Sequence, residues 1–416
     1  MNLRVSTADG SFRLLAWGDV YLCRLFVFAF ALIFCCPAPG ATVLVLQFHN
    51  NSQYSDLNWV GESIAETIRT ELSGPNQIVL DRESRAEGMR RLSLRPDSLF
   101  TKATLIRLGQ TLDVDYLSYG NYNANLPGGE TQLKNSSIQV TAHFIDLRKM
   151  HDGPDISEAG KLSELSRMEQ HLAWQAVKYV DPSANVPLEQ FMTSHKLIRI
   201  DAEESYVRGL LSSSPEQQQK WFAQAAALDP HFSNPAFELG KLSFAHKDYR
   251  QAITWFQRIT PENSQYAEAR FKMGLSAFAI GDYSSAVNNF REVVRIYPLS
   301  EIYNNVGAAE IELGLPSAID DFRRALDGDQ NDPVYLFNLG AALLKNNYFD
   351  EAWKRLQAAL GRNPDDTESR SLLERAQRHD SGPSGPKPLA TPRLKASFDG
   401  TAFRELKAML QEKRSQ

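Results

Sequence analysis

Cysteine is almost absent from this chain of 416 residues, since Cys23, Cys35 and Cys36 are all it has. The chain after Cys36 therefore offers no thiol for a disulfide, a thiolate metal site or a cysteine nucleophile. It also lacks the Gly-Lys-Ser/Thr of a phosphate-binding loop, the Gly-x-Ser-x-Gly of serine hydrolases and the His-Glu-x-x-His of zinc peptidases. None of the eight histidines stands three or four residues from another, the spacing of two metal ligands on one helix. We therefore expect no catalytic residue, no metal and no cofactor.

An excess of positive charge is missing as well. Lys and Arg number 45 against 50 Asp and Glu, a net charge of -5 that argues against nucleic acid as a partner. The chain is 43% hydrophobic and 23% charged, which excludes a wholly disordered protein. Five arginines do cluster locally, and we interpret them as a solvated helix face: Arg82, Arg85, Arg90, Arg91 and Arg95.

Long apolar runs are limited to one, at residues 25–34, with arginines before it and small residues up to Gly40 after it. This order is typical of a secretory signal, and the run is short for a membrane span. We expect residues 1–40 to be a signal peptide cleaved near Gly40, which predicts a periplasmic or secreted protein. Two membrane attachments stay open: an uncleaved anchor reaching back through Tyr21, or lipidation at Cys35 or Cys36, which would make an outer-membrane lipoprotein.

Residues 41–185 alternate short apolar runs with helical periodicities. The pattern predicts strands at 42–48, 78–80, 116–122 and 136–147, and helices at 59–72, 82–92, 99–112 and 158–180. A loop at 125–135 would join the last two strands as a hairpin. This order predicts an α/β domain, a mixed sheet with packed helices.

Five stretches within residues 42–147 carry a resemblance to a known domain: VLVLQFHNNS, LNWVGESIAETIRTEL, IVLDRES, LGQTLDVDYLSYGNY and IQVTAHFIDLR. They resemble the amino-terminal α/β domain of the TolB type, also seen in flagellar FlgO-like proteins. The resemblance implies an accessory or protein-docking module that often precedes tetratricopeptide repeats, and it hints at cell-envelope work. An alternative is a small-ligand-binding domain with a pocket between the sheet edge and Trp59.

The second half of the chain repeats with a period of 33 or 34 residues. A glycine recurs at that spacing, an alanine follows 11 or 12 residues later, and an aromatic or leucine comes four residues after the alanine: Gly240, Gly274, Gly307 and Gly340; Ala252, Ala286, Ala318 and Ala352; Phe256, Phe290, Phe322 and Leu356. Small residues let two helices of a hairpin approach closely, and such hairpins must stack to bury their apolar stripes. The pattern resembles the tetratricopeptide repeat (TPR), with five units over residues 201–366 forming an all-α solenoid.

After the repeats, the sequence predicts a capping helix at 367–379, a flexible linker at 380–397 rich in Pro, Gly and Ser, and an amphipathic tail helix at 398–414. We expect the tail to fold back on the body. Partner binding, membrane binding and self-association through this helix are the alternatives.

A binding groove is expected on the concave side, where the first helices of successive hairpins lie. The register places eleven residues there: Phe237, Lys241, Phe244, Phe271, Leu275, Phe278, Asn304, Ala308, Phe337, Ala341 and Lys345. The phenylalanines suggest apolar anchoring of a peptide or helix, although some could instead be core between repeats. The familiar chaperone-binding clamp of this family uses Lys and Asn, and Phe271 and Phe337 do not fit it.

Taken together, the sequence predicts a non-catalytic protein-binding adaptor or scaffold of the bacterial cell envelope, with a partner peptide or helix in the TPR groove. A self-associating structural envelope component and a small-ligand-binding α/β domain are the rival interpretations.

Overall fold

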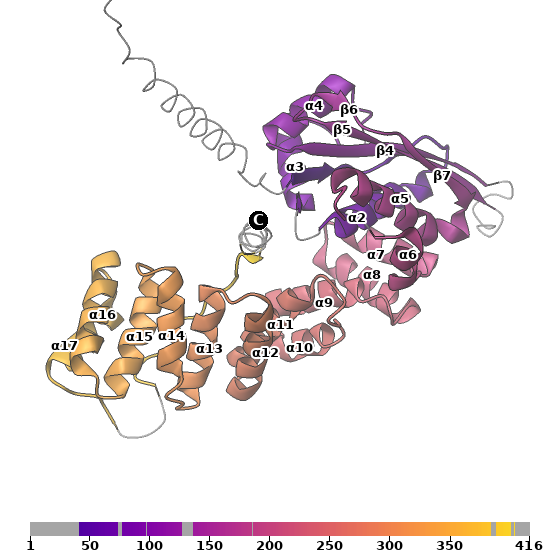
Figure 1. Ribbon diagram of the computed structural model, residues 1–416. Coiled ribbons are helices and arrows are strands. Elements are labelled where there is room, and N and C mark those ends of the chain that lie inside the picture. Colours follow the sequence, from indigo (N-terminus) through magenta and orange to yellow (C-terminus); the bar gives the residue numbers. More distant parts are fainter. Residues whose placement is uncertain are drawn as a thin grey trace, which may run out of the picture.

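The computed structural model describes residues 41–73, 77–96, 98–126, 136–184, 186–383, 388–400 and 403. The expected signal peptide, most of the 125–135 loop and nearly all of the tail helix lie outside these residues. Within them, an α/β domain is followed by a curved row of helical hairpins (Figure 1). No helix in this part of the chain is long and apolar enough to cross a membrane.

The sheet of the α/β domain is mixed, as the sequence predicts. Its strand order is β3-β1-β4-β5-β6, and two further strands pair at its margins, β2 with β4 and β7 with β5. The β3, β1 and β4 strands run parallel, whereas β5 is antiparallel to β4, β6 and β7. The bounds are β1 Ala41–Val45, β2 His49–Asn50, β3 Gln77–Val79, β4 Tyr116–Asn125, β5 Ser137–Asp146, β6 His151–Asp152 and β7 Ile156–Lys161.

Helices cover both faces of this sheet. On one face α2 (Trp59–Leu72) and α5 (Leu165–Val180) pack against Val43 and Val45, whereas on the other α3 (Arg82–Arg91) and α4 (Lys102–Thr111) pack near Leu44 and Leu46. Short 3₁₀ turns stand at Ser55–Leu57 and Leu162–Glu164. The β1 strand is apolar at successive positions because each of its faces is buried.

The prediction that a helix begins at residue 158 is wrong. Residues Ile156–Lys161 form β7, a strand that pairs with β5 from Ala142↔Ile156 onward, and α5 begins only at Leu165. The β7 sequence ISEAGK has few β-branched residues, and its side chains alternate between exposed and partly buried positions. Its strand conformation comes from pairing with β5 rather than from its own propensity.

The repeat region is a series of helical hairpins, α7/α8 to α15/α16, closed by α17 (Figure 1). The bounds are α6 Leu188–Ser194, α7 Ile200–Leu211, α8 Pro215–Leu228, α9 Asn234–Ala245, α10 Tyr249–Phe256, α11 Tyr266–Ala279, α12 Tyr283–Ile296, α13 Ser300–Glu312, α14 Ala318–Gly328, α15 Pro333–Lys345, α16 Phe349–Arg362 and α17 Thr367–Gln377. The repeated glycines and aromatics are packing partners: a Cβ at Gly274 would come within 2.5 Å of the Phe290 ring, and Gly240 and Phe256 are related in the same way.

The α/β domain and the first hairpin share one hydrophobic core. Tyr206 of α7 and Phe222 of α8 belong to the same buried cluster as Val60 and Ile64 of α2. Polar contacts cross the junction too: the Arg208 guanidinium donates to the Asp56 carbonyl at 3.1 Å. The solenoid is therefore fixed at its amino-terminal end to the α/β domain.

Two buried glutamates lie at this junction. The Ser63 hydroxyl donates to Glu203 at 2.8 Å and the Thr67 hydroxyl donates to Glu169 at 3.2 Å, while each carboxyl group keeps one buried oxygen that has no hydrogen-bond partner among the described residues. Burial raises the pKa of both carboxyls, and the charge of Glu203 raises that of Glu169 further. We infer that Glu169 keeps its proton at pH values where the unfolded chain has lost it.

We expect the free energy of unfolding to fall as pH rises above about 4.5, by up to about 1.4 kcal/mol per pH unit for this one proton. The sign follows because the folded state then binds more protons than the unfolded state. Glu169→Gln keeps the side-chain size and an oxygen for the Thr67 hydroxyl but does not titrate, so it should flatten this slope. Urea unfolding of residues 41–416 between pH 5 and 8 measures it, with the exposed Glu374→Gln as control. Equal slopes in Glu169→Gln and the original chain would contradict the raised pKa of Glu169.

Candidate peptide-binding groove

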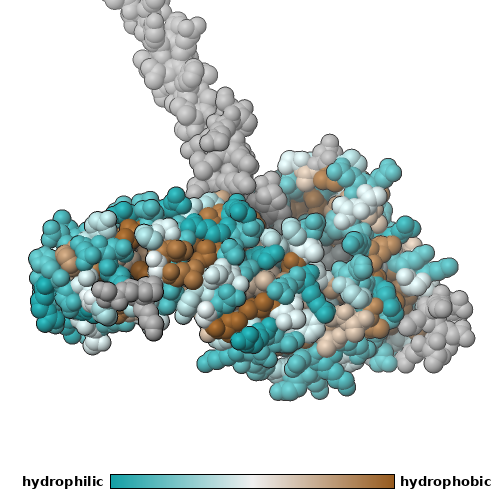
Figure 2. Space-filling view, turned by 90° about the horizontal axis from the view of Figure 1, so that it is seen from below, coloured by the Kyte–Doolittle hydropathy of each residue, from teal (hydrophilic) through white to brown (hydrophobic). Residues whose placement is uncertain are grey.

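The concave side of the solenoid is occupied by the chain's own carboxy-terminal region. Beyond α17, residues 388–398, here named the groove segment, run along α15 and α13 to α11 (Figure 1). The sequence predicts a flexible linker for most of this stretch. Figure 2 shows several separate hydrophobic areas on a surface that is otherwise mainly hydrophilic.

Two asparagine side chains bind the backbone of the groove segment. The Arg393 N–H donates to Asn338 Oδ1 at 2.9 Å, and Asn338 Nδ2 donates to the Arg393 carbonyl at 2.7 Å. Asn305 makes the same pair of bonds with Lys395, each at 2.8 Å. Each amide thus satisfies the donor and the acceptor of one peptide residue. The two residues bound in this way are separated by two positions, which is the side-chain period of extended backbone.

A third asparagine links these two sites. Asn304 Nδ2 donates to the Arg393 carbonyl at 2.9 Å and to Asn305 Oδ1 at 3.2 Å, while its own Oδ1 accepts from Asn338 at 2.8 Å. These three side chains are buried. Because a buried amide without partners costs about 1–3 kcal/mol, the three asparagines favour a groove that holds a peptide backbone.

The arginine of the groove segment is held by charge and by an aromatic face. Arg393 Nη1 and Nη2 donate to the two oxygens of Asp366 at 2.6 and 2.9 Å, and Nη2 also donates to Glu368 at 3.1 Å. Its guanidinium carbon lies 3.4 Å from the centre of the Phe337 ring. The Arg393 guanidinium holds the pKa of the Asp366 carboxyl well below its usual range. This combination of a bidentate ion pair and an aromatic face suits arginine and not lysine.

Lys395, two residues further along the groove segment, has a different set of partners. Its ammonium group contacts the carboxylate of Asp332, and it lies 4.8 Å from the centre of the Tyr335 ring. Asp332 also caps α15, accepting from the Val334 N–H at 2.8 Å, so that its position is fixed by the helix start.

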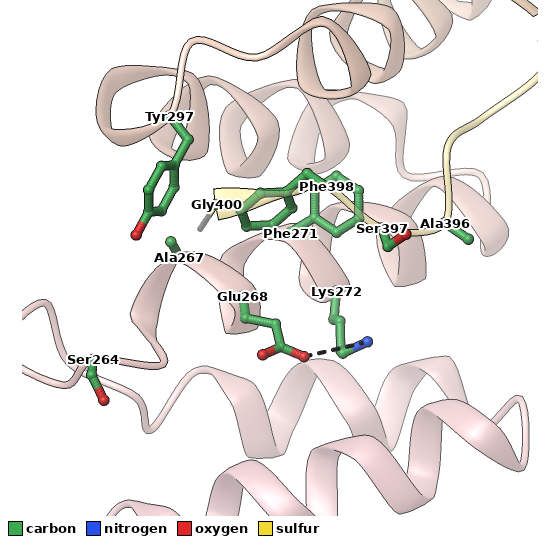
Figure 3. A pocket seen from close by; sticks show the side chains of 10 residues that line it. All are labelled: Ser264, Ala267, Glu268, Phe271, Lys272, Tyr297, Ala396, Ser397, Phe398 and Gly400. Atoms are coloured by element: carbon green, nitrogen blue, oxygen red, sulfur yellow. Dashed lines mark ion pairs between the residues drawn. The ribbon is translucent and has the colours of Figure 1, made fainter. Parts of the chain in front are cut away.

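The far end of the groove is aromatic. The Phe398 ring packs edge-on to Phe271 of α11, with ring centres 4.9 Å apart, and its centre is 5.5 Å from that of Tyr297. A hollow of about 230 Å³ lies beside these rings. Figure 3 shows Phe271 and Phe398 next to each other over α11, with Glu268 and Lys272 paired across one side of the hollow.

Four of the eleven groove residues chosen from the sequence contact the carboxy-terminal region. Phe271, Asn304 and Phe337 do so as described, and Lys345 donates to the Pro383 carbonyl at 2.8 Å. Among the described residues, the other seven make no hydrogen bond, ion pair or ring contact with the groove segment. Phe237, Leu275, Ala308 and Ala341 are buried in hydrophobic clusters, Phe244 and Phe278 are half-buried between repeats, and Lys241 pairs with Glu238 at 2.9 Å.

The sequence analysis did not select several residues that hold the groove segment: Asn305, Asp332, Tyr335, Asn338, Asp366 and Glu368. A usable signal was present. Asn304 and Asn338 stand 34 residues apart, one repeat period, and polar side chains recurring at an expected groove position indicate a ligand rather than a core. The basic Arg393 and Lys395 in an otherwise neutral stretch are the complementary signal.

Other candidate sites are weaker. Arg82 and Arg85 do not form a solvated face, since both pair at 2.8 Å with the buried Glu62. Trp59 is buried in the hydrophobic core of the α/β domain. Over the described ranges, no group of three or more His, Cys, Asp or Glu is placed to hold a metal ion.

Residues 268–300 match the family model of the tetratricopeptide repeat, which corresponds to α11 and α12. Among solved structures, the chain is similar to YrrB, described as a TPR protein with an unusual peptide-binding site, at 16% identity and a TM-score of 0.34, covering 46% of this chain and 91% of that one. It is similar to MamA from Desulfovibrio magneticus RS-1 at 20% identity and a TM-score of 0.35, covering 40% and 94%.

The LpoB carboxy-terminal domain from Salmonella enterica is a further similar structure, at 16% identity and a TM-score of 0.23, covering 32% of this chain and 91% of that domain. No curated protein sequence matches the chain. The protein thus combines an α/β domain with a solenoid of tetratricopeptide repeats, a repeat class whose concave surfaces bind other proteins.

Proposed function

We propose that this protein is a non-catalytic adaptor of the bacterial cell envelope that holds a partner peptide in its TPR groove. The observation that carries the proposal is the floor of the groove, where Asn305 and Asn338 each bind both backbone groups of one peptide residue. Such contacts recognise an extended chain regardless of its side chains. The groove is therefore built to hold a peptide.

The envelope location rests on two features of the sequence. The first forty residues have the order of a secretory signal, and residues 42–147 resemble the TolB-type domain. We propose a periplasmic or secreted mature chain, in which the α/β domain docks to an envelope component while the solenoid holds the peptide. Fractionation of the source cells, with the mass of the mature chain, tests this location. A mature chain that begins near residue 41 supports it, and a cytoplasmic chain retaining Met1 contradicts it.

Partner capture tests the adaptor function. The bait is residues 41–416, and the comparison is the same chain with Asn305→Ala and Asn338→Ala, shown by circular dichroism to be folded. We expect proteins retained by the first bait to be lost from the second. Asn288→Ala, at an exposed position on α12, the second helix of its hairpin, is the matched control and should retain them. Retention of the same proteins by every bait would assign binding to another surface.

A further inference from the structure

We propose that the groove recognises one class of ligand, an extended peptide with the pattern Arg-x-Lys-x-x-Phe, and that residues 393–398 of the chain are a resident copy of it. A partner carrying this pattern would displace the resident copy. The proposal rests on the proposed function, because it names the partner class of the same groove.

The backbone contacts require an extended ligand. The N–H and carbonyl of Arg393 both face Asn338, and those of Lys395 both face Asn305. In a helix these groups would be bonded to residues four positions away and would not be free to pair with side-chain amides. The groove therefore selects an extended peptide, which narrows the sequence-based expectation of a peptide or helix.

Side-chain contacts then select a basic sequence. The first position, that of Arg393, suits a guanidinium. The two oxygens of Asp366 bind it in a bidentate manner, Glu368 accepts a further hydrogen bond, and the Phe337 ring lies against the guanidinium. Two residues later, Asp332 and the Tyr335 ring receive an ammonium group. Three carboxylates thus face two cations along the groove.

Apolar contacts fix the register. Leu394, between the two cations, points to the other side of an extended chain and packs against the clusters of both α15 and α13. Phe398 reaches Phe271 and Tyr297 at the α11 end. A ligand shifted by one residue would place apolar side chains at the carboxylates and cations against the cores.

The resident copy acts as a competitor in cis. Because it belongs to the same chain, its effective concentration at the groove is of millimolar order for a short connection. A free peptide of the same sequence must therefore bind more weakly to the original chain than to a chain whose own segment is disabled. This difference is the measurable consequence of the proposal.

The experiment uses a fluorescein-labelled synthetic peptide with the sequence of residues 388–400 and measures fluorescence anisotropy. One receptor is residues 41–416 and the other is the same chain with Arg393→Glu and Lys395→Glu, which changes the segment and leaves the groove residues intact. We expect the peptide to bind about 10- to 100-fold more tightly to the second receptor. This factor corresponds to the loss of one or two charge-assisted contacts between the resident segment and the groove, which weakens its competition with the peptide. Equal affinity for the two receptors would overturn the proposal.

Two controls test the contacts individually. A peptide carrying Arg393→Glu should not bind the charge-reversed receptor, and adding Asn305→Ala and Asn338→Ala to that receptor should abolish binding of the original peptide. If the double asparagine variant does not fold, Glu368→Gln replaces it, since that carboxylate is exposed; a few-fold loss is expected. Unchanged binding in these variants would contradict the assigned contacts.

A random peptide library on the charge-reversed receptor separates this inference from the proposed function. Selected peptides with Arg-x-Lys-x-x-Phe spacing support the inference. Groove-dependent peptides without it overturn the inference and leave the adaptor function in place. Finding no groove-dependent peptide, together with no captured protein, would overturn both.

Discussion

Phe290→Ala is expected to lower the free energy of unfolding by about 3–5 kcal/mol. The Phe290 side chain is fully buried between the helices of the third hairpin, where its ring fills the space left by Gly274 and lies 5.6 Å from the Phe271 ring, measured between centres. Removing it leaves a cavity in the middle of the solenoid, because rigid helices close such a gap only partly. Urea unfolding of residues 41–416 by circular dichroism measures the change.

The matched control is Tyr348→Ala, which removes another aromatic ring from the solenoid at a position that is 57% exposed. It should change the free energy of unfolding by about 0.5 kcal/mol or less. A loss from Phe290→Ala as small as this control would contradict the packing described for the repeat.

Arg291→Met is expected to lower the free energy of unfolding by about 3–5 kcal/mol at pH 7. The Arg291 guanidinium joins two repeats, since it donates to Glu310 of α13 at 2.8 Å and to Asp321 of α14 at 3.1 Å. Both carboxylates are buried, and burial raises the pKa of Asp321 while Arg291 lowers it. Methionine fills much of the volume but removes the cation that both buried carboxylates share, and only the exposed Arg324 stays near Asp321.

Acid should relieve this loss. Without Arg291 the pKa of the buried Asp321 rises further, so protonation at pH 4 removes the uncompensated charge, and the deficit relative to the original chain should shrink. Arg324→Met is the control, because Arg324 is exposed and lies 3.6 Å from the same carboxylate; a loss of about 1 kcal/mol or less is expected. A deficit that is the same at pH 4 and pH 7 would contradict the electrostatic explanation.

The repeats could be predicted from the sequence because their spacing is set by packing. Gly274 and Phe290 occupy their positions since one must be small for the other to fit, and the same pair recurs in neighbouring units. The β7 strand could not be predicted in this way. It lies at the margin of the sheet with a polar sequence, and its conformation depends on pairing with residues of β5 that are 14 to 24 positions away.

The sequence analysis expected peptide binding along the first helices of the hairpins and a flexible linker at 380–397, whereas the structure lays residues 388–398 along those helices. Pro, Gly and Ser are typical of a linker, and they also suit a peptide whose order comes from the surface that holds it. The hydrogen bonds of Arg393 and Lys395 join residues 25 to 90 positions apart, which no local pattern reveals. Phe237 and Ala308 have the repeat positions expected of groove residues, yet both are buried in the hydrophobic core. The same face of a first helix supplies residues to the groove and to the core between repeats, so the repeat position alone does not separate the two.

Amide hydrogen exchange of the groove segment tests the central claim most directly. The Arg393 and Lys395 N–H groups donate to Asn338 and Asn305, so their exchange requires the segment to leave the groove. Mass spectrometry of residues 41–416 should show exchange over residues 388–398 slowed by about tenfold or more relative to a synthetic peptide of the same sequence, and restored by Asn305→Ala with Asn338→Ala. Exchange as fast as in the free peptide would show that the chain does not occupy its own groove.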